Sequence, residues 1–367
     1  MAGPARDRPC PACRSVRAAR KASGRWRRGA PPRRPRADGV AALRLRPRWA
    51  SADRPLRGPP PLLVIAGATA TGKTGLAIRL ALVLRDEGIP AEVITADSRQ
   101  VYRGLDIGTA KPTLDERRGV PHHGLDLVDP DEPFSVSDFA DHVATVLPSI
   151  ASADGLAILA GGTGFYLRAI AAGLDTDALP SDPAVRRRIE ADLLADGIDA
   201  TADRLRQIAP ALAAQIDLRN PRRMARALEI AELRGDRPLP ALRGYPASVA
   251  WLGLDVPREV HVRWIAERAR AQFDAGLVEE ARSLRERYDP ALPAFSAIGY
   301  AESWALLDGE IDRETAIERD AARNVALAKR QRTWFRREPH IAWLDPSAAD
   351  PLPMTLAAAC RLVRPHG

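Results

Sequence analysis

Short apolar runs recur along the chain and are separated by stretches with helical periodicity. Residues 62–66, 91–96 and 156–160 are largely apolar and of strand length, and further runs follow at 251–256 and 341–344. Apolar runs of this kind are typical of strands that are buried on both faces of a parallel sheet. Because helical segments alternate with these runs, we predict an α/β fold with a parallel-sheet core.

A long helical stretch interrupts this alternation in the middle of the chain. From about residue 170 to 245 the sequence is strongly charged and keeps a helical pattern. Helical patterns also dominate residues 258–287 and 300–337, which favours a helical C-terminal region. The predicted segments are a disordered basic N-terminal extension at 1–58, the first part of the core at 59–169, an inserted helical subdomain at 170–245, the second part of the core with the C-terminal helices at 246–347, and a C-terminal tail at 348–367.

The excess positive charge of the chain lies in its first 58 residues. They hold 17 Lys and Arg against 3 Asp and Glu, whereas the rest of the chain has a net charge of −6. This Arg- and Pro-rich segment lacks the apolar surface that would order it, so we expect disorder. A transit peptide and a translated upstream stretch without function are two interpretations of it. Any polyanion that binds the folded body must therefore contact local basic patches.

Cysteines and histidines give little indication of a metal centre. Cys10 and Cys13 are spaced like half of a zinc site, but no second Cys or His pair lies nearby. The adjacent His122 and His123 point in different directions, so we expect them to lie in a loop. With three cysteines in all and no apolar run near the ~20 residues that span a bilayer, we expect a cytoplasmic protein that does not contact a membrane.

The first apolar run leads directly into a glycine-rich loop of the form G-x-x-x-x-G-K-T. An Ala- and Leu-rich helical pattern follows from residue 75 to about 85, and this order of strand, loop and helix is the context of a Walker A motif. Backbone N–H groups and the helix N-terminus attract phosphate, Lys73 adds positive charge, and the Thr74 hydroxyl is placed to bind Mg²⁺. We therefore predict a P-loop NTPase-like core whose phosphate-binding residues are Gly67, Ala68, Thr69, Ala70, Thr71, Gly72, Lys73 and Thr74.

Polar residues follow the second and third apolar runs as well. Asp97, Ser98, Arg99 and Gln100 come after residue 96, and Thr163 belongs to a Gly-Gly-Thr-Gly segment after residue 160. Ligands of open α/β sheets bind at the carboxyl ends of the strands, so we expect both groups beside the phosphate loop. Asp97 could bind Mg²⁺, act as a base on a substrate or cap a helix, and the polar residues after it favour a substrate-binding role.

Two basic clusters lie further along the chain. Arg222, Arg223 and Arg226 occupy helix positions that share one face. Residues 329–337 combine Lys and Arg with two aromatic residues, a mixture that suits nucleic acid. A solvated charged face is the alternative for the first cluster, and core packing is the alternative for the aromatic residues of the second.

Together these motifs closely resemble the tRNA dimethylallyltransferase family, also called the IPP transferases. The resemblance covers about residues 62–345 in the family's order and spacing, and the N-terminal segment has no counterpart. The matching segments are GATATGKT at 67–74, ADSRQVYRGLDIGTAKP at 96–112, PHHGLDLVDPDEPFSVSDF at 121–139, LAGGTGFYLRAI at 159–170, NPRRMARALEI at 220–230, AIGYAE at 297–302 and AKRQRTWFRR at 328–337.

The resemblance implies an enzyme that transfers a dimethylallyl group from dimethylallyl diphosphate to N6 of adenosine 37 of tRNA, releasing diphosphate. It implies that the loop and Mg²⁺ hold the leaving diphosphate, with Lys73 stabilising its charge. Asp97 would be the general base, Thr163 would contact the flipped nucleotide, and Ser98 and Gln100 would contact the adenine edge. We expect a monomer.

The same resemblance assigns a set of residues to tRNA, several of them in the inserted subdomain that would bind the anticodon stem-loop. These residues are Asp97, Ser98, Arg99, Gln100, Thr163, Arg186, Arg222, Arg223, Met224, Ala225 and Arg226. One departure concerns Asn324 and Val325, where the family often has Thr-Arg. Arg323 lies two residues away, about 200° around a helix, so it does not replace that cation.

Three other functions compete with this interpretation. A P-loop kinase of small metabolites would need ATP and no helical insertion. A prenyltransferase acting on free adenine nucleotides would have less use for the basic helix at 222–226. A non-catalytic RNA-binding protein with a relic phosphate loop is disfavoured because Lys73, Thr74 and Asp97 are all intact.

Overall fold

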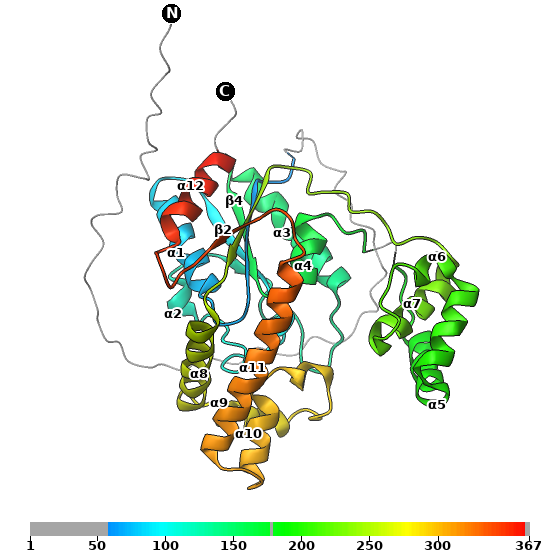
Figure 1. The fold of residues 1–367 in the computed structure, drawn as a ribbon. Helices are drawn as coiled ribbons and strands as arrows, with labels where there is room; N and C mark the ends of the chain where they lie inside the picture. Colours follow the sequence, from blue (N-terminus) through cyan, green and yellow to red (C-terminus); the bar gives the residue numbers. More distant parts are fainter. Residues whose placement is uncertain (1–57, 177–178, 364–367) are drawn as a thin grey trace, which may run out of the picture.

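Six parallel strands form one sheet in the order β3-β2-β4-β1-β5-β6 (Figure 1). The computed structural model describes residues 58–176 and 179–363, and the predicted α/β fold with a parallel sheet is confirmed. Residues 1–57 of the predicted extension, with Cys10 and Cys13, lie outside the described residues. The strands are β1 (Leu62–Gly67), β2 (Ala91–Ala96), β3 (His122–His123), β4 (Leu156–Gly161), β5 (Val249–Leu254) and β6 (Ile341–Leu344).

The central strands are apolar throughout because helices cover both faces of the sheet. In β1, Leu62 and Val64 belong to one hydrophobic core, while Leu63 and Ile65 belong to the other. The second core also contains apolar residues of the first and last helices of the described chain. The helices of the two layers are α1 (Lys73–Asp86) and α12 (Leu352–Val363) on one face, and α3 (Val136–Ser152) and α4 (Gly164–Ala171) on the other.

Two elements differ from the sequence-based prediction. The tail predicted at 348–367 contains α12, which buries Leu356 and Cys360 against the sheet. Its buried face also includes small residues such as Ala359, which weakens the apolar signal of the pattern. The histidine pair predicted to lie in a loop forms β3 at the edge of the sheet, because His123 follows β2 in register with Ile94.

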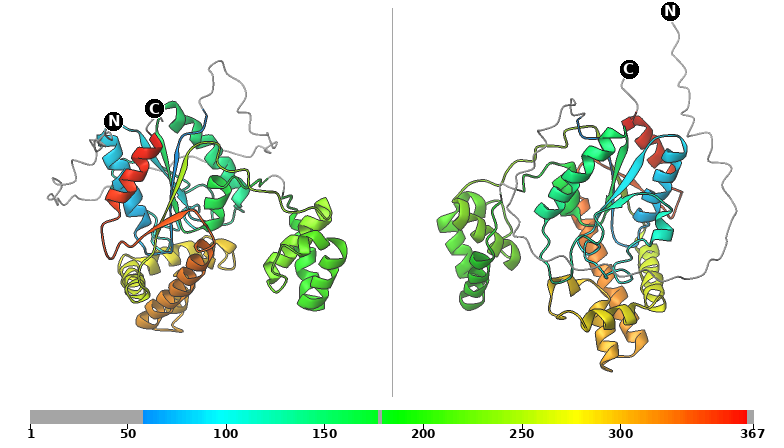
Figure 2. Two further views of the ribbon diagram at one scale, coloured as in Figure 1. Left: turned by 45° about the horizontal axis from the view of Figure 1, so that its top comes forward. Right: turned by 180° about the vertical axis from the view of Figure 1, so that it is seen from behind.

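The inserted subdomain forms a lobe of its own beside the sheet layers, as both views in Figure 2 show. Its core is built around residues such as Leu205, Met224 and Leu228, which belong to neither core of the sheet. The two connecting segments pair with each other, since the N–H groups of Arg243 and Gly244 donate to the carbonyls of Gly173 and Ala172, both at 3.0 Å. The lobe consists of α5 (Pro183–Ile208), α6 (Pro210–Ala213) and α7 (Pro221–Arg234).

A group of C-terminal helices lies at the edge of the sheet where β1 ends (Figure 1). Ala68 of the loop after β1 packs against Ile265 and Ala328 of two of these helices. Among the described residues, no helix is both long enough and apolar enough to cross a membrane. The elements here are α8 (Arg258–Asp274), α9 (Leu277–Arg285), a 3₁₀ turn (Pro293–Ser296), α10 (Tyr300–Leu307) and α11 (Arg313–Phe335), and the short α2 (Leu114–Arg117) lies before β3.

Candidate active site

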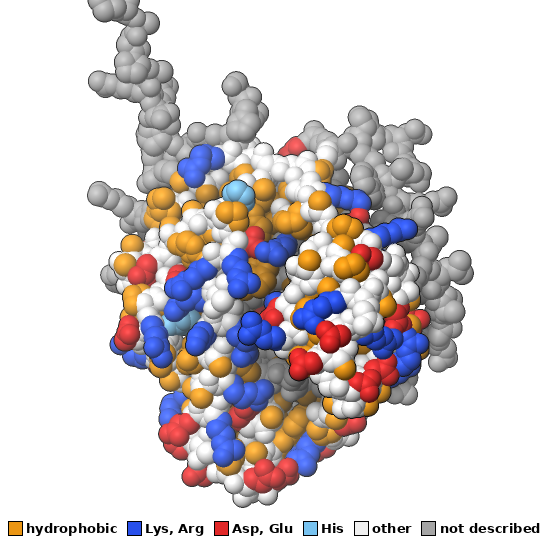
Figure 3. Space-filling view, turned by 45° about the vertical axis from the view of Figure 1, so that its right-hand side comes forward, with side chains coloured by type: hydrophobic (Ala, Val, Ile, Leu, Met, Phe, Trp, Pro, Cys, Tyr) orange, Lys and Arg blue, Asp and Glu red, His pale blue; other side chains and the backbone are white. Residues whose placement is uncertain are grey.

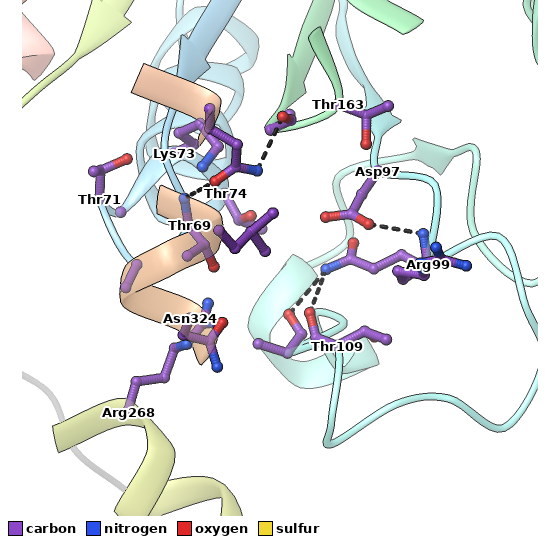
Figure 4. Close-up of a pocket in the computed structure, with 18 of the residues that line it drawn as sticks. Thr69, Thr71, Lys73, Thr74, Asp97, Arg99, Thr109, Thr163, Arg268 and Asn324 are labelled. Carbon is purple, nitrogen blue, oxygen red and sulfur yellow. Dashed lines mark hydrogen bonds between the residues drawn. The ribbon is translucent and has the colours of Figure 1, made fainter. Parts of the chain in front are cut away.

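A cavity of about 1350 Å³ opens at the carboxyl ends of β1, β2 and β4. Its walls are the phosphate loop, the strand ends at 97–100 and 160–163, and residues of α8 and α11 (Figure 4). Parallel sheets place ligands at this edge. The structure therefore brings together the loop and the two polar strand ends that the sequence predicted to be neighbours.

The phosphate loop has a backbone conformation that few side chains would allow. A Cβ atom on Gly67 would lie 2.7 Å from the carbonyl oxygen of Leu254, so β5 requires glycine there. Ala70 has a φ of 59°, a left-handed conformation that is costly for a residue with a side chain. The buried hydroxyl of Thr71 donates to the carbonyl of Ala68 at 2.9 Å and helps to hold this shape.

Lys73 begins α1 and lines the cavity. Its ammonium donates a hydrogen bond to the carbonyl of Ala68 at 2.6 Å. The pKa of Lys73 is lowered to about 8, mainly by burial; the charge of Asp97 opposes this shift and the charge of Arg268 adds to it. A cation that burial and a second cation both destabilise is well suited to bind an anion.

Helices α8 and α11 hold the phosphate loop through two side chains that the sequence analysis missed. The Thr69 N–H donates to Oε1 of Gln331 at 2.8 Å, and Nε2 of the same side chain donates to the carbonyl of Gly162 at 3.0 Å. Nε2 of the buried His261 lies 2.8 Å from the Thr69 carbonyl. Gln331 lies within the basic run at 329–337, whose pattern indicates no separate role for it. Of the two interpretations of the aromatic residues in this run, core packing is the one observed for Phe335, which is buried.

The ends of β2 and β4 are joined by hydrogen bonds. The Ser98 N–H donates to Oγ1 of Thr163 at 3.0 Å, and Oδ1 of Asp97 accepts the Arg99 N–H at 2.8 Å. The residues after Asp97 form turns, so the helix-cap interpretation of Asp97 is wrong. Asp97 and Thr163 therefore face the cavity opposite the phosphate loop (Figure 4).

Gln100 lines the cavity but has a structural role that the sequence did not indicate. Its Nε2 donates to the carbonyls of Thr109 and Ala110 at 2.9 and 3.2 Å, and the residue is 5% exposed. Its Oε1 is buried and has no partner among the described residues. Of the two polar atoms of this amide, only the oxygen is left to bind a ligand.

In the helical lobe, two of the predicted tRNA-binding arginines contact a buried glutamate. Arg186 donates through Nε to Glu229 at 2.9 Å, and Arg226 donates through Nη1 at 2.7 Å. Burial by itself raises the pKa of Glu229, but the hydrogen bonds from the two arginines outweigh it and lower the pKa overall. Arg226 also donates to the carbonyls of Leu179 and Pro180, so it joins parts of the lobe.

The remaining residues of this predicted set divide between surface and core. Arg222 and Arg223 are exposed, and Arg222 also lines the cavity. Met224 and Ala225 are 0% and 2% exposed. Their side chains face the core of the lobe because they lie on the apolar side of α7. Direct contact with tRNA would require side chains that face outward.

The departure at 324–325 changes which side chain carries charge. Val325 packs against a small apolar cluster that includes Ala70 and Ile265. Asn324 lines the cavity, and its Oδ1 accepts a hydrogen bond from Nη2 of Arg268 at 3.1 Å. Arg268, which no motif singled out, therefore supplies a cation from α8 on this side of the cavity.

The oxygen donors of the cavity suit Mg²⁺. Thr74 and Asp97 both line it, and Mg²⁺ prefers a hydroxyl or carboxylate together with waters and phosphate oxygens. Within the described part of the chain, no group of three or more His, Cys, Asp and Glu side chains is placed to hold a metal ion by itself. A metal ion here would need phosphate oxygens or waters as further ligands.

The fold and the cavity define an α/β protein with a P-loop-like core and a helical lobe inserted into it. Residues 100–338 match the family model described as IPP transferase. The chain is 45% identical over 291 residues to a tRNA dimethylallyltransferase of Anaeromyxobacter dehalogenans, covering 78% of this chain and 95% of the relative. It therefore belongs to the IPP transferase family.

Solved structures agree with this assignment. The full-length tRNA isopentenylpyrophosphate transferase of Bacillus halodurans is 36% identical, with a TM-score of 0.60, over 82% of this chain and 96% of that one. A eukaryotic dimethylallyltransferase, described as acting on tRNA, is 25% identical, with a TM-score of 0.65, over 82% and 77% of the two chains.

Proposed function

We propose that this protein is a tRNA dimethylallyltransferase. It transfers the dimethylallyl group of dimethylallyl diphosphate to N6 of adenosine 37, beside the tRNA anticodon, and releases diphosphate. The observation that carries this proposal is the single cavity with Lys73 and the phosphate loop on one wall, and Asp97 and Thr163 on the other. Membership of the IPP transferase family supports the same reaction.

The diphosphate of the donor would lie in the phosphate loop. When the C–O bond of the donor breaks, the electron pair stays with the diphosphate, which gains negative charge. Lys73 would attract this charge, and a positive group directed at developing charge is among the strongest contributions to catalysis. The loop would then serve a leaving group and not a nucleoside triphosphate.

The acceptor amine would lie beside Asp97. N6 of adenosine is a weak nucleophile because its lone pair is delocalised into the purine ring. As the N–C bond forms, one N6 proton passes to the carboxylate of Asp97. The Arg99 N–H holds Oδ1 at 2.8 Å, which leaves Oδ2 to take the proton. Ser98 and Thr163 would contact the base, which must leave its stack to enter the cavity.

Mg²⁺ is the proposed cofactor. Thr74 would hold the ion through its hydroxyl, together with oxygens of the diphosphate. The ion would neutralise part of the charge on the leaving group. Asp97 would remain free to act as the base, since Mg²⁺ commonly keeps several waters as ligands.

The helical lobe would bind the anticodon stem-loop. Arg222 and Arg223 are its exposed cations at the start of α7. Figure 3 shows that Lys and Arg side chains are spread over this face of the molecule and are interspersed with Asp and Glu. Because residues 59–367 are net negative, such local patches must provide the contacts with RNA phosphates. We further propose that the protein is a monomer, since one chain supplies the lobe and both walls of the cavity. We also propose that it acts in the cytoplasm.

One labelling experiment tests this function against its alternatives. The purified protein is incubated with labelled dimethylallyl diphosphate or labelled ATP, together with tRNA, AMP or no acceptor. We expect the dimethylallyl label to enter tRNA alone, and digestion followed by mass spectrometry to locate it at adenosine 37. Transfer of phosphate from ATP, or of the dimethylallyl group to AMP in preference to tRNA, would contradict the proposal.

A further inference from the structure

His261 of α8 is a buried imidazole, 3% exposed, that contacts the phosphate loop on one side and α11 on the other. Its Nε2 lies 2.8 Å from the carbonyl oxygen of Thr69, and its Nδ1 lies 3.3 Å from Nη2 of Arg332. The same Nη2 donates to the carbonyl of Val256 at 3.0 Å and lies 2.8 Å from Oδ1 of Asp255, which fixes the guanidinium. Both ring nitrogens of His261 therefore have a defined partner.

The chemistry of these two partners determines which nitrogen of His261 carries the proton. A guanidinium has donors and no acceptor, so the Nδ1 that faces Arg332 has to accept and carries no proton. A carbonyl oxygen only accepts, so the Nε2 that faces Thr69 has to donate. We therefore assign His261 to the neutral tautomer with its proton on Nε2, because only this form satisfies both contacts.

Charged groups from three elements act on this ring. Burial lowers the pKa of His261, although the hydrogen bond to the Thr69 carbonyl opposes the shift. The positive charges of Arg332 on α11 and Lys73 on α1 also lower this pKa, whereas the negative charge of Asp255 after β5 raises it. The imidazole is therefore neutral near pH 7 and takes a second proton only at acid pH. That proton would sit on Nδ1, directed at the guanidinium, and would break the contact with α11.

The contact with His261 holds the peptide unit that leads into the strained part of the loop. The carbonyl of Thr69 and the N–H of Ala70 belong to one planar trans peptide, so they point to opposite sides. Ala70 has a φ of 59°, a conformation that persists only where the surroundings hold it. Gln331 accepts the Thr69 N–H while His261 binds its carbonyl. The Ala70 N–H is thus directed away from α8, and N–H groups beside a left-handed residue form a concavity that binds anions.

These contacts give His261 a role that no motif indicated. We propose that His261 is a positioning residue, which as the neutral Nε2–H tautomer holds the phosphate loop in the shape that binds diphosphate, and that its protonation weakens this hold. His261 does not line the cavity, so it would act through Thr69 and Ala70 without touching the ligand. The inference rests on the proposed function for the identity of the ligand. Inorganic diphosphate with Mg²⁺ is the probe, because its binding depends neither on prenyl transfer nor on tRNA.

The first test separates the hydrogen bonds of His261 from its bulk, in the full-length protein. His261→Leu keeps most of the volume and removes both contacts, whereas His261→Gln keeps an N–H donor for Thr69 and an acceptor oxygen for Arg332. Calorimetry near pH 7 measures the affinity for diphosphate, and thermal unfolding checks that each variant is folded. We expect His261→Leu to weaken binding by about 10-fold, the upper part of the usual range for one hydrogen bond, and His261→Gln to recover most of this loss. Wild-type affinity in His261→Leu would mean that the side chain only fills space, which would overturn the inference.

The second test uses pH and does not depend on the folding of His261→Leu. The diphosphate affinity of the wild type should fall as the pH is lowered through the depressed pKa of His261. His261→Gln cannot take up this proton and should lack that fall, and the ratio of the two affinities cancels the titration of diphosphate itself. His142→Gln is the matched control, since it replaces another histidine of lowered pKa that does not line the cavity, and it should keep the wild-type profile. Parallel profiles for the wild type and His261→Gln would overturn the inference.

A third variant tests the part assigned to α11. Arg332→Gln keeps an N–H donor for Nδ1 of His261 but removes the positive charge that disfavours protonation of the ring. The fall in diphosphate affinity should therefore move to higher pH in this variant. An unmoved profile would contradict the assignment of the tautomer by Arg332.

The outcomes also separate this inference from the proposed function. If the wild type transfers no dimethylallyl group to tRNA but loses diphosphate affinity on His261→Leu, the reaction is wrong and the positioning of the loop stands. If the wild type transfers the group and His261→Leu binds diphosphate normally, the reaction stands and the role of His261 is wrong.

Discussion

The ammonium of Lys73 donates a hydrogen bond to the carbonyl of Ala68, five residues earlier in the same loop, at 2.6 Å. The lysine that the sequence motif assigns to a phosphate is thus held close to the loop backbone. This contact places the charge of Lys73 beside the backbone groups that would surround a diphosphate.

Replacing Lys73 by alanine should reduce turnover by at least about 100-fold, since positive groups at developing charge are worth about that much or more. The affinity for tRNA should remain that of the wild type, because Lys73 would serve the diphosphate. Steady-state rates and a tRNA binding titration check this. A parallel loss of tRNA binding would show that donor and acceptor binding are not divided as proposed.

The affinity for inorganic diphosphate should depend on pH through Lys73. Its pKa of about 8 means that the side chain is charged below pH 8 and neutral above it. The affinity for diphosphate should therefore be highest near pH 7 and fall as the pH rises through about 8. In the complex the inflection should lie at higher pH, because the bound anion favours the charged form of Lys73. Lys73→Arg, which stays charged above pH 12, is the control without this inflection. A flat profile for the wild type would contradict the role of Lys73.

Asp97→Asn should slow the chemical step by about 100-fold or more, the lower part of the range for a general base. The asparagine keeps the shape of the side chain and the hydrogen bond from the Arg99 N–H. Single-turnover rates with saturating donor and tRNA measure the effect, and Asp131→Asn at an exposed position is the matched control. Rates near the wild type would exclude Asp97 as the base.

Arg222 and Arg223 should bind RNA phosphates through charge. Each phosphate neutralised on a single strand contributes about −0.7 to the slope of log K against log salt, so the double alanine variant should flatten the slope by about 1.4. Arg206→Ala, whose guanidinium pairs with Asp203 at 2.6 Å on α5, is the control in the same lobe. Identical salt curves for the double variant and the wild type would show that these two arginines belong to a solvated charged face and do not bind RNA phosphates.

Arg226→Ala should act on stability before it acts on RNA. The variant leaves the buried Glu229 with Arg186 as its partner and should destabilise the lobe by about 1–3 kcal/mol, less than the loss of a fully buried pair. Thermal unfolding measures this, and the additional change Glu229→Gln should recover part of the loss. Normal stability in Arg226→Ala would contradict the structural role.

Local chemistry explains why the sequence predicted the centre of the site. β1, the phosphate loop and α1 are contiguous, so spacing alone identified Lys73 and Thr74. Gln331 contacts Thr69 across 262 residues of sequence, and no local pattern encodes the packing of α11 that brings them together. The ion pair between Arg226 and Glu229, in contrast, could have been predicted from the sequence. Glu229 follows Arg226 by three residues, a spacing at which two side chains on one helix can meet.

The other departures have similar causes. Met224 and Ala225 were assigned to RNA by position within a matching motif, but the apolar side of α7 decides where they point. The family resemblance assigned Gln100 to the adenine edge, whereas its amide donates a hydrogen bond to the Thr109 carbonyl, in a loop whose path the sequence did not show. In each case burial within a tertiary environment decided the role of the side chain.

The paired connectors at Gly173 and Gly244 make the lobe a module with its own stability. A Cβ atom on Gly173 would lie 2.3 Å from the carbonyl oxygen of Gly244, so the neck depends on a residue that has no side chain. Since the cores of the lobe and the sheet share no residues, damage to one unit can remain local. Substitutions beyond this neck can therefore change the proposed RNA-binding surface of the lobe while the cavity at the sheet stays unchanged.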